Sequence, residues 1–260
     1  MKQFLILTSC LLTNVFGEDP WNPPENPDPT VILQEARDDA QNQRYQVALA
    51  KQLWYHKHAL EFQPAQAGVR LSFALSYWLE LARDYPPAKE ALLNIRKETA
   101  GEINSGKNVR NLFQDYAAIN RVLDEPDETV KLFQKLHVKD SNAARNSFLI
   151  AKPALIAGKH YELVLHYLDP DRDIAGHIRN YTSGIERAKQ REGDSRLRLI
   201  DFHNQKLTNE AATLIAILAL ANEREIAERI AKKARAARDD PDYHSVISEA
   251  LDGKTPAPFP

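Results

Sequence analysis

Residues 207–221 read LTNEAATLIAILALA and form the most apolar stretch of the chain beyond its first 17 residues. Alanine and leucine dominate it, and both lose little side-chain freedom in a helix. Because its apolar residues cover nearly the whole circumference of a helix, the pattern predicts a central helix that is buried on most sides. The charged stretch 223–238 repeats Ile226 and Ile230 at helical spacing, so we expect it to pack beside the first as a partner helix.

The same helical spacing recurs along the rest of the chain. It is clearest at Leu71, Ala74, Leu75, Trp78, Leu81 and Ala82, and again at Val109, Leu112, Phe113, Tyr116, Ile119 and Leu123. No stretch alternates apolar and polar residues between hairpin turns, as the strands of an antiparallel sheet would. The 33 alanines and 30 leucines far outnumber the 10 valines, which favours helices over strands. We therefore predict an all-α protein whose helical body spans residues 30–252.

Short breaks divide this body into helices. They fall at Asp28-Pro29, Gln43-Arg44-Tyr45, Gln63-Pro64, Tyr85-Pro86-Pro87, Asp124-Glu125-Pro126, Gly158-Lys159, Asp169-Pro170, Asn222-Glu223 and Asp240-Pro241. Connections of a few residues force neighbouring helices to pack antiparallel. The pairs recur at roughly 35–45 residues, which is typical of helical repeat arrays. Residues 171–206 fit the pattern least, and we interpret them as either a long helix pair or an irregular insertion.

Small residues and a closing proline at helical spacing resemble a tetratricopeptide repeat. In the first helix pair the small residues are Ala36, Ala40, Ala48 and Ala59, accompanied by Tyr45, Leu49 and Leu60, and Pro64 closes the unit. In that family the small residues let paired helices approach closely. The resemblance implies antiparallel helix pairs stacked as a right-handed α-solenoid with a concave groove. In size and repeat type the chain is similar to periplasmic tetratricopeptide proteins that scaffold envelope assemblies.

The two ends of the chain are expected to lie outside the helical body. Residues 1–17 have a positive start, an apolar centre and a small last residue, which is the pattern of a secretory signal peptide. Residues 18–29 form a proline-rich linker, and 253–260 a flexible proline-rich tail. Cleavage would leave a chain with no cysteine and no transmembrane helix, exported to the periplasm or the extracellular space. The alternative is a lipid anchor at Cys10, because Leu7-Thr8-Ser9-Cys10 resembles a bacterial lipobox.

Charge argues against nucleic acid as a partner. The chain has 34 lysines and arginines against 36 acidic residues, a net charge of −2. The basic residues of 232–238 have acidic neighbours, so we interpret them as the solvated face of a helix. On that face we expect two ion pairs at i,i+4 spacing, Glu225 with Arg229 and Glu228 with Lys232.

No pattern in the sequence marks a catalytic, cofactor or metal site. The phosphate-binding glycine loop, the nucleophile elbow and the helical zinc motif are absent. The histidine pairs 56/58 and 160/166 lack the spacing of helical metal ligands. We predict that His160 and His166, together with Tyr161 and Tyr167, pack and form hydrogen bonds between helices. Asp169, Asp171 and Asp173 alternate as at the start of a calcium loop, but the glycine and the final glutamate of such a loop are missing, and we interpret them as helix caps.

Four aromatic residues are the candidate binding site: Trp54, Tyr55, Tyr77 and Trp78. Adjacent helical residues point about 100° apart, so one member of each pair is free to line a groove. Aromatic side chains are favoured anchors for protein partners. We therefore expect a non-enzymatic scaffold or adaptor that binds a protein or peptide. The alternatives are an exported all-helical enzyme acting on a polysaccharide or cell-wall polymer, and an adaptor that associates with copies of itself.

Overall fold

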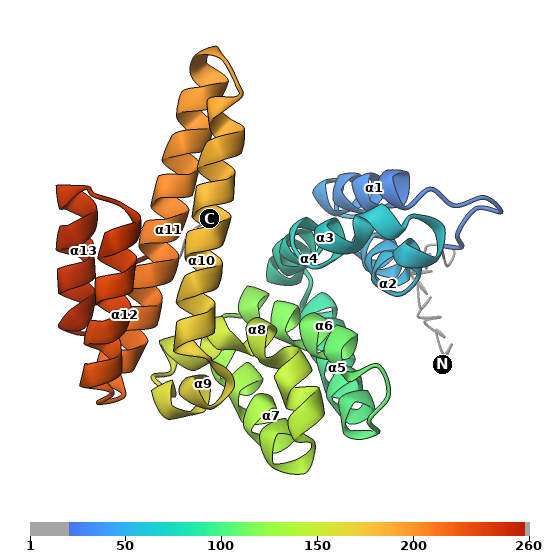
Figure 1. Ribbon diagram of the computed structural model, residues 1–260. Helices are drawn as coiled ribbons and strands as arrows, with labels where there is room; N and C mark the ends of the chain where they lie inside the picture. Colours follow the sequence, from blue (N-terminus) through green and yellow to red (C-terminus); the bar gives the residue numbers. More distant parts are fainter. Residues whose placement is uncertain (1–20, 258–260) are drawn as a thin grey trace, which may run out of the picture. The chain divides into compact units, whose positions relative to one another are not determined.

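The computed structural model describes residues 21–257, and every regular element in that range is a helix (Figure 1). The helices are α1 (Pro29–Gln41), α2 (Tyr45–Phe62), the short 3-10 helix η1 (Pro64–Gln66), α3 (Ala67–Arg70), α4 (Phe73–Asp84), α5 (Pro86–Asn104), α6 (Val109–Val122), α7 (Pro126–Lys139), α8 (Ser141–Ala157), α9 (Tyr161–Tyr167), α10 (Pro170–Lys189), α11 (Gly193–Leu220), α12 (Arg224–Ala237) and α13 (Pro241–Leu251). Many helices that are neighbours in sequence pack against each other, among them α1 with α2, α4 with α5, α7 with α8 and α10 with α11. The all-α prediction is therefore confirmed.

Some predictions concern residues that lie outside the described range. They are the signal peptide at 1–17, the lipid anchor at Cys10 and the last three residues of the tail. Within the described range, no helix combines the length and the apolar character that crossing a membrane requires.

The chain divides into two compact units, and the division falls inside α6. Within the described range, the first unit holds residues 21–105 and 118–124, and the second holds 106–117 and 125–257.

The core of the first unit is built on the apolar face that the sequence predicted around Trp78. Leu75, Trp78 and Leu81 of α4 are buried and pack with Ala88 and Leu92 of α5. The indole Nε1 of Trp78 donates a hydrogen bond to the carbonyl oxygen of Ala88 at 2.9 Å, so its polar atom is satisfied within the core.

The segment before α1 is anchored to the first unit. Residues 22–26 are exposed, but Trp21 packs edge-on against Trp54 with 6.3 Å between ring centroids, and the Lys51 ammonium lies 5.8 Å from its ring centre. Asp28 caps α1 by accepting from the backbone N–H of Thr30 at 2.8 Å. The linker therefore contacts α2 through Trp21.

The core of the second unit is α11. Leu207, Ala211, Ala212 and the whole run 214–218 are buried, which confirms the prediction of a central helix. They pack against the inward faces of α12 and α13, including Ile230 and Tyr243. The amphipathic face of α12 was predicted correctly.

The start of this central helix was placed too late in the sequence. α11 begins at Gly193 and runs as one helix of 28 residues. Residues 171–206 are therefore part of a long helix pair, which consists of α10 and the first half of α11. The error has a physical cause. The residues 193–206 are mostly exposed and carry little apolar periodicity, and their helix is supported by contact with α10.

The two predicted ion pairs on α12 are replaced by others. Arg229 and Lys233, one turn apart, both reach Asp171 at the start of α10, at 2.8 and 2.7 Å. Hydrogen bonds from Lys233 and then Arg229 hold the pKa of Asp171 below its usual value. Glu228 pairs with Arg224, which precedes it by one turn, at 2.8 Å. The packing of α10 on α12 supplied a carboxylate that sequence spacing does not show.

Asp169 and Asp173 act as caps at the start of α10, as predicted, whereas Asp171 pairs with Arg229 and Lys233 instead. Asp169 accepts a hydrogen bond from the backbone N–H of Arg172, and its own N–H donates to a carboxylate oxygen of Asp173, both at 3.1 Å.

The predicted packing role of the α9 tyrosines is confirmed for Tyr167, whose hydroxyl lies 2.6 Å from Nδ1 of His137 on α7. The described residues hold no cluster of three or more potential metal ligands.

Acidification is expected to destabilise the first unit through His56. Its ring packs edge-on to Trp78 at 5.9 Å, and an Nη1 of Arg70 lies 3.2 Å from its Nε2. Burial, and then the positive charge of Arg70, lower the pKa of His56 from 6.5 to about 3. The unfolded chain therefore takes up the proton first, and the free energy of unfolding falls as the pH drops from 6.5 towards 3. At pH 4 we expect a loss of about 2–3 kcal/mol.

Urea unfolding followed by tryptophan fluorescence at pH 7 and pH 4 measures this loss. All three tryptophans belong to the first unit, so the signal reports on that unit alone. A His56→Leu variant should lose most of the difference between the two pH values. An undiminished difference in the variant would assign the acid sensitivity to another group.

Candidate functional site

A groove in the first unit is the best candidate for a binding site. It is a cavity of about 200 Å³ between α1, α2 and α4, which we call the α1–α4 groove. Its polar walls are formed by Arg37, Gln41, Tyr45, Gln52, Tyr77 and Glu80.

Local sequence explains why the groove is open. Ala36 and Ala40 stand one turn apart on α1, and both line the groove. Their short side chains fill little of the space between the helices, whereas Leu81 forms part of an apolar base. The small residues that resemble a repeat signature therefore also create the space for a ligand.

Gln52 provides the groove with a buried hydrogen-bond acceptor that has no donor within residues 21–257. Its side chain is only 2% exposed, and its Oε1 has no hydrogen-bond partner among the described residues. A buried acceptor without a partner costs about 1–3 kcal/mol. A ligand that offers an N–H or O–H group at this position would recover that cost.

Tyr77 is held in place by its neighbours. The Arg37 guanidinium lies over its ring, 4.1 Å from the centroid, and Phe73 stacks on it at 6.5 Å with an angle of 30° between the ring planes. The arginine therefore orients the tyrosine ring at the edge of the groove. Glu80 and Asp84 follow on α4, so carboxylates line the groove together with the guanidinium of Arg37.

The four aromatic residues predicted from the sequence have different positions. Tyr77 lines the α1–α4 groove. Tyr55 and Trp78 are buried, at 0% and 1% exposure, and the Tyr55 hydroxyl donates to Gln66 Oε1 at 2.8 Å. Trp54 is half-buried and stacks on Phe62, with 5.8 Å between ring centroids. The structure therefore brings one of the four to the groove.

Sequence reasoning did not find Arg37, Tyr45 or Gln52. Each is a common residue type, with Arg37 on α1 and Tyr45 and Gln52 two turns apart on α2, and no motif joins them. Ala36 and Ala40 were the available signal, because a stripe of small residues on α1 indicates where another helix or a ligand can approach.

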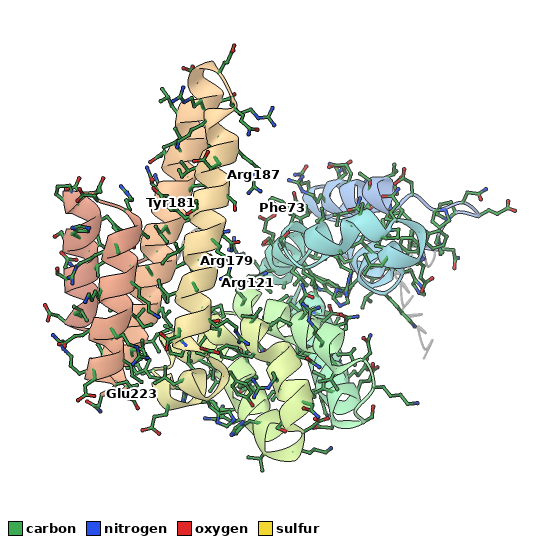
Figure 2. All side chains as sticks on the ribbon, in the orientation of Figure 1. Phe73, Arg121, Arg179, Tyr181, Arg187 and Glu223 are labelled. Atoms are coloured by element: carbon green, nitrogen blue, oxygen red, sulfur yellow. The ribbon has the colours of Figure 1, made fainter. Side chains whose placement is uncertain are left out.

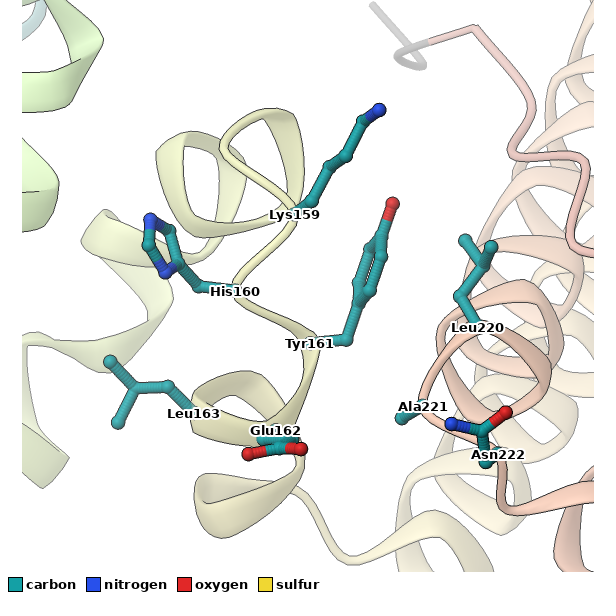
Figure 3. A pocket seen from close by; sticks show the side chains of 8 residues that line it. All are labelled: Lys159, His160, Tyr161, Glu162, Leu163, Leu220, Ala221 and Asn222. Carbon is teal, nitrogen blue, oxygen red and sulfur yellow. The ribbon is translucent and has the colours of Figure 1, made fainter.

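A second cavity lies in the second unit, where the turn between α8 and α9 meets the turn between α11 and α12. It has a volume of about 350 Å³, and Figure 3 shows Lys159 and Tyr161 projecting on the side of Leu220. Lys159 and Asn222 both have positive φ angles, 59° and 62°, as the tight turns require. Its polar side chains are exposed or half-buried, and none of them has a buried donor or acceptor without a partner.

No protein-family model, no curated protein and no solved structure matches this chain.

Proposed function

We propose that this protein is an exported, non-enzymatic scaffold or adaptor that binds a peptide segment of a partner protein in the α1–α4 groove. The observation that carries the proposal is the buried Oε1 of Gln52, an acceptor that no described residue satisfies. An extended peptide presents a backbone N–H at every residue except proline. Such a donor meets the requirement of Gln52 without depending on the peptide's sequence.

The other walls of the groove suit the side chains of such a peptide. Tyr77 offers a ring face, Arg37 attracts a carboxylate, and Glu80 and Asp84 attract a lysine or arginine. The volume of about 200 Å³ is below the range of roughly 300–1,000 Å³ that is usual for small-molecule sites. It accommodates one or two side chains of a longer ligand better than a whole cofactor.

The proposal includes the architecture that the tetratricopeptide resemblance implies. In it, the helix pairs stack antiparallel as a right-handed α-solenoid, and the α1–α4 groove is part of the concave face. Stacked helix pairs present extended concave surfaces that bind extended segments of other proteins. We further propose that the protein works in the periplasm or outside the cell, after loss of residues 1–17.

A Gln52→Met variant is expected to separate binding from stability. Removing the unsatisfied acceptor should leave the free energy of unfolding unchanged or raise it by about 1 kcal/mol. Peptides selected from a displayed random library against the wild type should nevertheless bind the variant at least tenfold more weakly, because the variant cannot accept their N–H group. Fluorescence anisotropy with labelled peptides measures the affinity, and thermal unfolding measures stability.

The matched control is Arg83→Ala, compared with Arg37→Ala. Both remove one guanidinium from the first unit, but Arg83 is exposed on α4 and does not line the groove. Arg37→Ala should weaken peptide binding, and Arg83→Ala should leave it unchanged. Equal binding to the wild type and to Gln52→Met, or a library that yields no binding peptide, would rule out this site.

A further inference from the structure

A second groove lies along the long helix pair of the second unit. It is a cavity of about 300 Å³ between α10 and α11, which we call the α10–α11 groove. His177, Tyr181 and Arg187 contribute from α10, and His203, Lys206 and Glu210 from α11. Figure 2 shows Tyr181 and Arg187 on this pair.

Specific contacts set the register of the two helices around this groove. His177 Nδ1 lies 3.0 Å from a carboxylate oxygen of Glu210, and the Tyr181 hydroxyl donates to Asn204 Oδ1 at 3.2 Å. Gly184 lies against the imidazole of His203, where a Cβ would come within 2.3 Å of the ring. The absence of a side chain at Gly184 therefore makes room for His203 between the helices.

The groove carries more positive than negative charge. Neither Arg187 nor Lys206 forms an ion pair with another described residue. Glu210, the carboxylate that lines the groove, is paired with His177. Burial, followed by the charges of Arg187 and Lys206, lowers the pKa of His203. Burial opposes the ionisation of Glu210, yet His177, Lys206 and Lys152 together hold its pKa below the usual value. The permanent charges on the lining side chains sum to +1, from +2 and −1.

We propose that the α10–α11 groove binds the phosphate group of a small phosphomonoester. A phosphate monoester carries a charge of about −1.5 to −2 at pH 7 and three strong acceptor oxygens, so it accepts hydrogen bonds from Arg187 and Lys206 together. The planar fork of an arginine donates two parallel hydrogen bonds to a phosphate, and the neighbouring lysine adds a mobile point charge.

The size and the apolar walls of the groove define the rest of the ligand. About 300 Å³ is at the lower end of the range for small-molecule sites, so it holds a phosphate with a small organic group attached. The half-buried ring of Tyr181 lines the same cavity and offers an apolar surface to that group. The ligand is therefore a compact phosphomonoester, either free in solution or as the headgroup of a lipid.

Isothermal titration calorimetry with glycerol 3-phosphate tests this site on the full chain. We expect saturable binding that weakens at least tenfold in Arg187→Gln and in Lys206→Gln. The matched control is Arg179→Gln, which removes the same charge from an exposed position of α10 that does not line the groove. Circular dichroism verifies that all the variants remain folded.

Two further probes define the ligand. Succinate has a similar charge but no phosphate, and we expect it to bind at least tenfold more weakly. Sedimentation with phosphatidylcholine vesicles that contain phosphatidic acid reports whether the phosphate source is a lipid headgroup. Binding to glycerol 3-phosphate or to these vesicles supports the site if the binding is lost when Arg187 is replaced. Absence of binding to both phosphate sources, equal affinity for succinate, or an equal loss in Arg179→Gln would overturn the proposal.

Discussion

A Leu218→Asp substitution is expected to unfold the second unit at room temperature. Leu218 is the last residue of the buried run 214–218 of α11, is 1% exposed, and belongs to the core shared with α12 and α13. The substitution removes about 2–3 kcal/mol of apolar burial. It also buries a carboxylate among apolar side chains, at a cost of several kcal/mol more. The sum is comparable to the 5–15 kcal/mol that stabilises a typical domain.

Leu197→Asp is the matched control for this prediction. It makes the same chemical change on the same helix, but Leu197 is 65% exposed in the outer part of α11. We expect it to change the free energy of unfolding by less than about 0.5 kcal/mol. Thermal unfolding followed by far-ultraviolet circular dichroism distinguishes the two variants. A Leu218→Asp protein that melts at the wild-type temperature would show that this face of α11 is not buried.

An Asp39→Ala substitution is expected to destabilise the first unit by about 3–5 kcal/mol. The ammonium of Lys51 lies 2.8 Å from carboxylate oxygens of both Asp39 and Glu35, and Arg44 Nε also donates to Asp39 at 2.8 Å. Lys51 and Asp39 are 7% and 4% exposed. Burial opposes the charge on Lys51, but its hydrogen bonds to Asp39 and Glu35 hold its pKa above the usual value. Without Asp39, the carboxylate that remains beside this buried ammonium is that of Glu35, whose side chain is half-exposed.

The double variant Asp39→Ala/Lys51→Met tests whether the cost comes from the stranded charge. A methionine of similar length fills the space of the lysine, so the double variant should recover most of the lost stability. Glu35→Ala should cost less than about 1 kcal/mol, because the Glu35 side chain is 48% exposed. Urea unfolding followed by tryptophan fluorescence provides the three values. A double variant no more stable than Asp39→Ala would contradict the buried-pair explanation.

Helix boundaries were predictable because local chemistry decides them. At Asp28-Pro29, Asp169-Pro170 and Asp240-Pro241 an aspartate accepts a backbone N–H and a proline occupies the first helical position. Both preferences act within one turn, so they can be recognised without knowledge of the fold. Amphipathic faces were predictable for the same reason, as Trp78 and its neighbours on α4 illustrate.

The candidate site was less predictable because it depends on three helices. Of the aromatic residues singled out, Tyr77 reaches the α1–α4 groove, while Tyr55 and Trp78 are part of the core. Which side of α2 and α4 faces the groove depends on how these helices rotate against α1. That rotation depends on side-chain packing throughout the unit, so it cannot be predicted from any single residue.

The sequence by itself determined that the described chain is helical, where most helices begin and end, and which stretch is most deeply buried. These properties arise from propensity, capping and periodicity, which act over a few residues. The tertiary structure alone decided that Gln52 is buried without a partner, that Lys51 pairs with Asp39, and that Arg187 and Lys206 share a groove. These pairings join residues on different helices, and close packing fixes them only when the helices have come together.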